Sequence, residues 1–260
     1  MKNSNKIIQS FWYGDSLSQV EQLCINSFIA NGHEFHLYTY NLNLEGVPKA
    51  CILKDANEII DESKIFLDSR GIIASFSDYF RMKLLYKRGG WWVDTDIICL
   101  KPFDFLEDHI FSSEYVNSEI YANIGCIKAI KKSPFLLNYI RAIELFLGED
   151  QEIKWGTFGP RLMNNLLSLY EIKGLLQAPE VFIVPKLISS ENNRLMFYRL
   201  FNPLDAEIIK KGLEGSYSIH LFNELWRLQG IDKHHPFIER SPLYYLQKIY
   251  SRTESVTNDN

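Results

Sequence analysis

The chain has 260 residues, 46% of them hydrophobic, and a formal net charge of −4 from 28 Lys and Arg against 32 Asp and Glu. This balance is typical of a globular protein, and it excludes a disordered or fibrous chain and the basic surface of a general nucleic-acid binder. No stretch approaches about 18 consecutive apolar residues, so we expect no membrane-spanning helix. The first residues lack the pattern of a secretion signal, and we therefore expect a cytoplasmic protein.

The sequence holds four widely separated cysteines, Cys24, Cys51, Cys99 and Cys126. They form no C-x-x-C pair and no spacing typical of zinc ligands, so a structural zinc site is not expected. We expect each of them to pack as a small buried apolar side chain.

Strand and helix patterns alternate through the first third of the chain. The apolar spacing predicts a strand over residues 6–13, a helix over 16–31 and a second strand over 34–40. Because parallel strands need a crossover connection, this order with short glycine-containing joints indicates a parallel sheet and an α/β fold.

A helix followed at once by an apolar strand comes next. Apolar residues recur at helical spacing over residues 75–88, and a Gly-Gly pair then supplies a left-handed stop. Residues 91–100 are apolar except for two aspartates, and we expect one strand there, with its first two tryptophans pointing to opposite faces.

The later elements follow the same signals. We expect strands over residues 120–130, 181–184 and 216–221, and helices over 134–147 and 161–170.

The two aspartates inside the apolar segment are Asp94 and Asp96. At a spacing of two in a strand, their carboxylates point to the same side, where desolvation and mutual repulsion cost several kcal/mol. A divalent cation with hard oxygen ligands, Mg²⁺ or Mn²⁺, relieves that cost, and substrate phosphates complete its shell. The alternatives are a turn with two solvated aspartates and an aspartyl-phosphate phosphohydrolase. The second is disfavoured because Ile98 stands where those enzymes have Thr or Val.

Asp78 and Arg81 lie three residues apart on the preceding predicted helix and so share a face. They form either a local surface ion pair or a clamp, in which Arg81 holds a phosphate or sugar hydroxyl and Asp78 accepts from sugar hydroxyls.

The motifs around these residues resemble the glycosyltransferases whose sugar-binding region carries a D-x-D motif, a group that includes family-32-type enzymes and the catalytic core of the clostridial glucosylating toxins. The resemblance runs through most of the chain in the family's order. It rests on K-I-I-Q-S-F-W-Y-G at residues 6–14, S-D-Y-F-R at 77–81, G-G-W-W-V-D-T-D at 89–96, N-I-G-C-I-K-A at 123–129, T-F-G-P at 157–160 and H-L-F-N-E-L-W at 220–226.

The resemblance implies an α/β GT-A fold, a single domain with a mixed, mostly parallel central sheet flanked by helices. Its domain would span residues 1–250, with a nucleotide-sugar-binding half over 1–100 and an acceptor-side half over 101–250. Residues 251–260 would form a flexible tail. It also implies a nucleotide-sugar donor, Mn²⁺ or Mg²⁺ as cofactor, and retention of the anomeric configuration.

The resemblance implies donor-binding roles as well. The Trp12 ring would stack on the base while the Phe11 backbone reads it. Asp78 and Arg81 would hold the donor sugar, and Asn123 would face it.

A second set of implied roles concerns the metal and the diphosphate. Asp94 would lie on the ribose or sugar side and also next to the metal, and Asp96 would bind the metal. Either His220 or Asn223 would be a further metal ligand, and Trp226 would close over the diphosphate. Arg81, Asp94 and Asp96 are the expected catalytic residues.

We therefore expect a metal-dependent retaining glycosyltransferase that moves a hexose (Gal, Glc, GlcNAc or Man) from a nucleotide sugar to a hydroxyl of a glycan or lipid-linked glycan. The donor is expected to be UDP-linked rather than GDP-linked, and the setting to be bacterial capsule, O-antigen or lipopolysaccharide synthesis. The alternatives are a toxin-like protein glucosyltransferase, for which no delivery domain is visible, and a non-catalytic nucleotide-sugar or glycan-binding module.

Several choices stay open at this point. The sequence does not choose the donor sugar, the acceptor or the linkage, nor between same-face attack and double displacement, and it does not give the oligomeric state. The helix expected over residues 243–252 either contacts the inner membrane face peripherally or is solvated.

Overall fold

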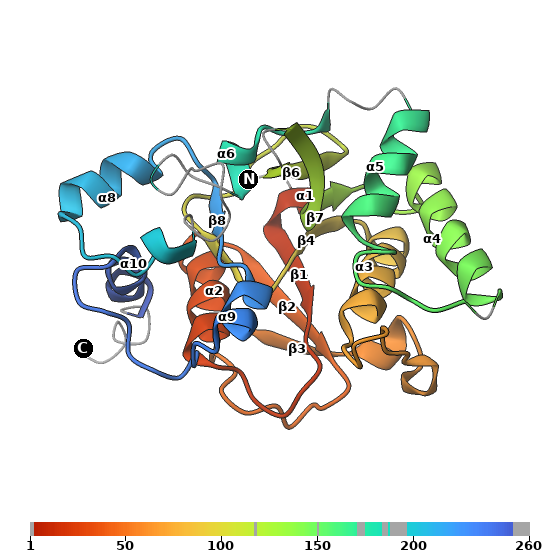
Figure 1. Cartoon of the computed structure of the whole chain (residues 1–260), viewed down its shortest axis with the longest axis horizontal. Helices are drawn as coiled ribbons and strands as arrows, with labels where there is room; N and C mark the ends of the chain where they lie inside the picture. The colour runs from red at the N-terminus through yellow and green to blue at the C-terminus, as the bar shows by residue number, and fades with distance from the viewer. Residues whose placement is uncertain are drawn as a thin grey trace.

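The computed structural model describes residues 3–116, 119–149, 151–170, 175–183, 187 and 197–251. Its centre is a six-stranded sheet in the order β3-β2-β1-β4-β7-β6 (Figure 1). The first four of these strands are mutually parallel, and β7 runs antiparallel to both of its neighbours. The predicted mixed, mostly parallel sheet is therefore confirmed. The strands are β1 (Ile7–Phe11), β2 (Glu34–Thr39), β3 (Ile52–Asp55), β4 (Gly90–Val93), β6 (Ile110–Val116) and β7 (Glu119–Ala129).

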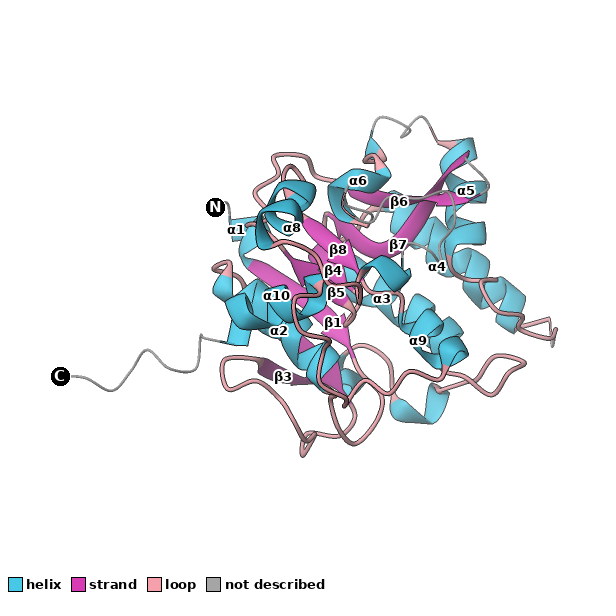
Figure 2. Cartoon of the chain, turned by 60° about the vertical axis from the view of Figure 1, so that its left-hand side comes forward, coloured by secondary structure: helices cyan, strands magenta, loops and turns pink. Residues whose placement is uncertain are grey.

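Helices cover both faces of this sheet (Figures 1 and 2). The helices α2 (Gln19–Ala30), α8 (Ala206–Leu213) and α10 (Pro242–Tyr250) lie on one face. On the other face lie α3 (Ala74–Arg88), α4 (Pro134–Leu147) and α5 (Pro160–Leu169). Shorter helical segments are α1 (Asn3–Lys6), α6 (Pro179–Phe182), α9 (Asn223–Gln229) and the 3₁₀ turns Ala56–Glu58 and Glu62–Lys64. None of the described helices is long and apolar enough to cross a membrane.

Two apolar cores separate the sheet from these helices. Trp91 belongs to the core under α2, and Trp92 belongs to the core under α3. Both rings are almost fully buried, as the alternation of side chains along a strand requires. Cys24, Cys99 and Cys126 are also buried, and the cysteines form no disulfide in the described residues.

Local signals in the sequence explain where the main helices begin and end. Ser18 caps α2 by accepting a hydrogen bond from the Val20 N–H, and Glu21 accepts in turn from the Ser18 N–H, which completes a capping box. Helix α3 ends at Gly89, whose φ of 70° favours glycine. A Cβ at Gly89 would lie 2.6 Å from the backbone nitrogen of Lys131, so the turn also needs the missing side chain.

The strand predicted over residues 91–100 is in fact two strands in different sheets. The Asp94 N–H donates to the Gly125 carbonyl, and the Ile97 N–H donates back to the Asp94 carbonyl, so the chain turns between them. After this turn, β5 (Ile97–Cys99) pairs antiparallel with β8 (Ser218–His220) in a separate two-stranded sheet. The D-x-D motif therefore lies on a turn at the end of β4.

Other expectations need correction. The strand predicted over residues 181–184 is replaced by α6, because Pro179 at the first helical position favours a helical turn. Residue 184 lies outside the described residues, as does the expected tail from residue 252 onward. Strands β3 and β6 were not predicted. The division into two halves at residue 100 stays a prediction.

Candidate active site

Three side chains that can bind a metal gather at the end of β4. Asp94, Asp96 and His220 each offer one ligand atom, and these atoms all lie within 4.8 Å of one another. The pairing of β5 with β8 creates this cluster, because it sets Ile97 opposite His220. The Leu221 N–H also donates to the Asp96 carbonyl at 2.8 Å, which fixes the two segments against each other.

Asp96 is the most enclosed member of the cluster, with 3% of its surface exposed. Its Oδ2 accepts a 2.7 Å hydrogen bond from the Asn223 N–H and lies 3.2 Å from Nε2 of His220. Burial opposes ionisation of Asp96, but His220 and the Asn223 N–H outweigh it and hold the pKa of this carboxyl below its usual range. Burial likewise opposes charging of His220, yet the neighbouring Asp96 and Asp94 raise the pKa of the imidazole. Each of the two groups thus favours the charged form of the other.

The polar atoms around this pair fit a divalent cation. Nδ1 of His220 and Oδ1 of Asn223 are buried and have no hydrogen-bond partner in the described part of the chain. The two carboxylates and the imidazole make a donor set that suits Mn²⁺ or Mg²⁺. Binding to His220 requires a neutral ring nitrogen, so a metal would replace the proton that Asp96 now stabilises.

Arg81 ties the cluster to α3. Its guanidinium lies 3.0 Å from Oδ1 of Asp94 and 3.1 Å from Oδ1 of Asp78, and it donates to the Ile124 carbonyl at 2.6 Å. The group also lies over the Trp92 ring, 4.9 Å from its centre. The side chains of Arg81 and Asp78 are only 6% and 13% exposed, so the surface ion pair considered from the sequence is excluded.

The carboxyl group of Asp78 has a raised pKa. Its burial, only partly offset by Arg81 and reinforced by the nearby Asp94, raises the pKa of Asp78 to about 7. The loop before α5 closes over it, because a Cβ on Gly159 would lie 2.8 Å from Oδ2 of Asp78. Burial similarly raises the pKa of Asp94 above its ordinary value, with Arg81 opposing the shift and Asp96 adding to it.

Asn123 lies on β7 beside this group. Its Nδ2 donates to Oε1 of Glu114 at 3.0 Å, and its Oδ1 accepts from the Gly125 N–H at 2.7 Å. Glu114 was missed from the sequence because β6 itself was not predicted. A signal for it exists: Ser112 and Glu114 are polar residues two positions apart in a short, mainly apolar segment, which is the spacing of one strand face.

Phe11 and Trp12 lie next to each other at the end of β1 and have different surroundings. The Phe11 ring is buried and stacks on Phe80 with centroids 4.4 Å apart, which leaves its backbone for any contact with a base. The backbone N–H of Trp12 donates to the Tyr38 carbonyl. The indole Nε1 of Trp12 is buried and has no hydrogen-bond partner among the described residues.

Trp226 is buried in this structure, and its expected closure over a diphosphate stays a prediction. Its side chain is 2% exposed, packs on Phe197 and Phe201, and donates from Nε1 to the Leu221 carbonyl at 2.8 Å. This is the environment of a core residue. In this structure the ring therefore has no exposed face that a diphosphate could contact.

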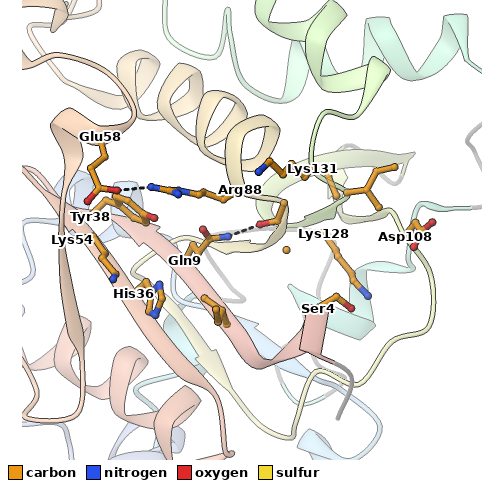
Figure 3. Close-up of a pocket in the computed structure, with 15 residues that line it drawn as sticks. Ser4, Gln9, His36, Tyr38, Lys54, Glu58, Arg88, Asp108, Lys128 and Lys131 are labelled. Atoms are coloured by element: carbon orange, nitrogen blue, oxygen red, sulfur yellow. Dashed lines mark hydrogen bonds and ion pairs between the residues drawn. The ribbon is translucent and has the colours of Figure 1, made fainter.

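A separate cavity of about 490 Å³ opens at the opposite end of the same strands (Figure 3). Gln9 of β1 and Lys128 of β7 line it, with Arg88 at the end of α3 paired across it to Glu58. The side chains of the cluster do not line this cavity. The candidate active site is thus defined by the cluster at the carboxyl ends of β1 and β4, where ligands of open α/β sheets bind.

Comparison with known proteins supports this location. Residues 18–116 match the family model described as a glycosyltransferase sugar-binding region containing a DXD motif. Human alpha-1,4-N-acetylglucosaminyltransferase is 25% identical in an alignment of 156 positions, which covers 57% of this chain and 42% of the relative. The match thus spans less than half of that relative's length.

Solved structures share the fold at low sequence identity. The ligand-free glycosyltransferase domain of the YGT toxin superposes with a TM-score of 0.52 at 8% identity, covering 98% of this chain and 94% of that domain. The PaToxG glycosyltransferase gives a TM-score of 0.51 at 16% identity, covering 82% of this chain and 85% of that one.

The fold is the GT-A fold of these glycosyltransferase domains, and residues 18–116 match the DXD-containing sugar-binding region of glycosyltransferases. The resemblance seen in the sequence is therefore confirmed. Within the matched region the D-x-D motif is Asp94-Thr95-Asp96, and it supplies two of the three residues of the cluster.

Proposed function

We propose that this chain transfers a hexose from a nucleotide sugar to a hydroxyl acceptor, with a divalent metal and with retention of anomeric configuration. The observation that carries the proposal is the convergence of Asp94, Asp96 and His220 beside the buried Arg81–Asp78 pair. Three carboxylates in one place, Asp96 buried and Asp78 and Asp94 partly buried, are costly to a folded protein unless cationic groups offset them, which favours a metal ion here.

The donor would be a UDP-sugar carrying Gal, Glc, GlcNAc or Man. A structure of the YGT toxin domain holding UDP shares this fold, with a TM-score of 0.51 at 9% identity, covering 98% of this chain and 94% of that domain. In the proposed complex the Trp12 indole contacts the base and the Phe11 backbone reads its edge. Arg81, Asp78 and Asn123 hold the sugar.

The metal, Mn²⁺ or Mg²⁺, would be held by Asp94, Asp96 and His220, with Asn223 as a further oxygen ligand. When bound, such an ion neutralises the charge that builds on the diphosphate as the sugar–phosphate bond breaks. Arg81 adds a fixed positive charge on the same side, and its position costs no reorganisation because Asp78, Asp94 and the Ile124 carbonyl already hold it.

The acceptor would be a glycan or lipid-linked glycan of bacterial capsule, O-antigen or lipopolysaccharide, reached from the cytoplasmic side. A second candidate is a protein acceptor. The similarity of the fold to the glycosyltransferase domain of the YGT toxin favours this candidate. The two differ in the molecule that receives the sugar, so acceptor panels separate them.

Donor turnover tests the proposal directly. Wild type and Asp96→Ala are incubated with UDP- and GDP-sugars in Mn²⁺, Mg²⁺ or EDTA, and free nucleotide is measured with and without glycan or protein acceptors. We expect one UDP-sugar to be consumed by wild type only, and only with metal. Exposed Glu107→Gln serves as the matched control and should behave as wild type. Donor binding without turnover on any acceptor would instead indicate a binding module.

A further inference from the structure

The amide of Asn123 is held by the protein at both of its ends. Its Nδ2 donates to Oε1 of Glu114 on the neighbouring strand β6, and its Oδ1 accepts from the Gly125 N–H. An ionised carboxylate can only accept a hydrogen bond and a backbone N–H can only donate one. These two contacts therefore fix which end of the amide is oxygen and which is nitrogen, and the side chain has one orientation.

The pairing of β6 with β7 makes this arrangement rigid. Ser112, two residues before Glu114 and on the same face of β6, donates from its hydroxyl to the Asn123 carbonyl at 2.9 Å. Ser112 is fully buried and Glu114 is half-buried. The Glu114 carboxylate thus comes from a fixed strand position, and its bond to the amide is charge-assisted and stronger than a neutral one.

Gly125 connects the same amide to the acidic cluster. The Asp94 N–H donates to the Gly125 carbonyl at 2.8 Å. A Cβ on Gly125 would lie 2.9 Å from Oδ1 of Asn123 and 3.1 Å from Oδ2 of Asp94, so both oxygens lie against one glycine. Hydrogen bonds and close contacts thus connect Glu114, through Asn123 and Gly125, to the candidate metal ligand Asp94.

We propose that Glu114 is a positioning residue for sugar transfer, which acts by fixing the amide of Asn123 so that its second Nδ2 proton faces the donor sugar. The inference rests on the proposed function. Without the carboxylate, only the oxygen end of the amide would be held, by the Gly125 N–H at 2.7 Å and the Ser112 hydroxyl at 3.5 Å. The Nδ2 end would then be free to move away from the donor sugar. The role requires a hydrogen-bond acceptor at residue 114 and does not require its negative charge.

A set of four variants tests this role. Steady-state kcat and KM for UDP-sugar turnover, UDP binding by calorimetry and thermal unfolding are measured for Glu114→Gln, Glu114→Ala, Asn123→Ala and the double alanine variant. Glu119→Ala, an exposed carboxylate on β7, is the control. Glu114→Leu, which keeps an apolar stem, takes the place of Glu114→Ala where the alanine variant does not fold.

We expect Glu114→Gln to stay close to wild type, because its side-chain oxygen accepts the same proton. Glu114→Ala should lose about 10- to 100-fold in kcat/KM, the range expected for a lost hydrogen bond to a charged group. In the Asn123→Ala background the loss of Glu114 should add nothing further, because the two residues act as one unit.

Three results would overturn the inference. Full activity of Glu114→Ala would show that Glu114 does not act through the amide. The same conclusion would follow if Glu114→Ala lowered kcat/KM as much in the Asn123→Ala background as in the wild type. A Glu114→Gln variant as inactive as Glu114→Ala would make the carboxylate itself a reacting group. A wild type that neither binds UDP nor consumes a donor would instead overturn the proposed function, and this inference with it.

Discussion

The backbone N–H of Asn223 donates a 2.7 Å hydrogen bond to Oδ2 of Asp96, although the two residues lie 127 positions apart in the sequence. The contact depends on Phe222, which has a left-handed backbone with φ of 53°, an uncommon state for a bulky residue. Strained residues of this kind concentrate at functional sites. Here the strain turns the start of α9 so that its first N–H reaches the buried carboxylate.

The first prediction concerns metal binding. Because Asp96 lies at the centre of the cluster, Mn²⁺ should stabilise the wild type against thermal unfolding, by about 2.7 kcal/mol at a hundredfold excess over Kd. Asp96→Asn should remove the effect, whereas Glu107→Gln should keep it. The measurement is the difference in Tm between Mn²⁺ and EDTA. An equal Mn²⁺ shift in Asp96→Asn and wild type would contradict the assigned ligand.

The second prediction concerns the guanidinium of Arg81, which contacts Asp78, Asp94 and a backbone carbonyl together. A lysine has one ammonium group and cannot keep this planar set of contacts. Arg81→Lys should therefore lower kcat by roughly 100-fold or more, as the loss of a fixed charge-stabilising donor does elsewhere.

Lys83→Arg is the matched control for that variant. Lys83 lies on the same helix but pairs on the surface with Glu144, so its exchange should leave kcat unchanged. If Arg81→Lys turned over donor as fast as Lys83→Arg, the guanidinium would have no part in stabilising the leaving group.

The third prediction is a pH dependence of stability. Asp78 has its pKa raised to about 7 in the folded chain by burial, against a value of about 3.9 for an unfolded aspartate. Between these values the folded protein holds a proton that the unfolded chain has released. The free energy of unfolding should therefore fall as pH rises from about 4 to 7, by an amount on the order of 4 kcal/mol from this group.

Asp78→Asn isolates that contribution because it cannot titrate. Denaturant unfolding of both proteins is measured in EDTA between pH 4 and pH 8. The variant should decline less steeply with pH than the wild type over this range. Curves that stay parallel would mean that Asp78 titrates at its ordinary value in the folded state.

The fourth prediction concerns the close approach at Gly125. A methyl group there would meet the oxygens of Asn123 and Asp94 at 2.9 and 3.1 Å, closer than ordinary contact. Gly125→Ala should cost about 1–3 kcal/mol of stability, as overpacking does, and should lower activity by displacing the Asp94 carboxylate. Gly148→Ala is the control, because its added methyl group would approach no atom closer than 3.4 Å. Equal stability and activity of the two variants would argue against this constraint.

Elements with strong local signals could be predicted from the sequence. Helix α4 spans Pro134–Leu147, as predicted, because a proline at the first helical position and regular apolar spacing act within a few residues. The end of α3 at Gly89 was also predicted, because a Gly-Gly pair is a local signal for the end of a helix. In contrast, β6 was missed because its short run mixes serine, glutamate and apolar residues, and only its pairing with β7 makes it a strand.

The sequence by itself determined the class of fold and the residue types of the site, because the spacing of Asp78, Arg81, Asp94 and Asp96 is a local property of the chain. Only the tertiary structure decided which distant groups complete it. The pairing of β5 with β8 brings His220 to Asp96, and the pairing of β6 with β7 brings Glu114 to Asn123. The first contact joins segments far apart in the chain, which no local pattern encodes. The second joins residues nine positions apart on consecutive strands, and the register of β6 against β7 decides it. Tertiary packing also decided that the Trp226 ring is buried.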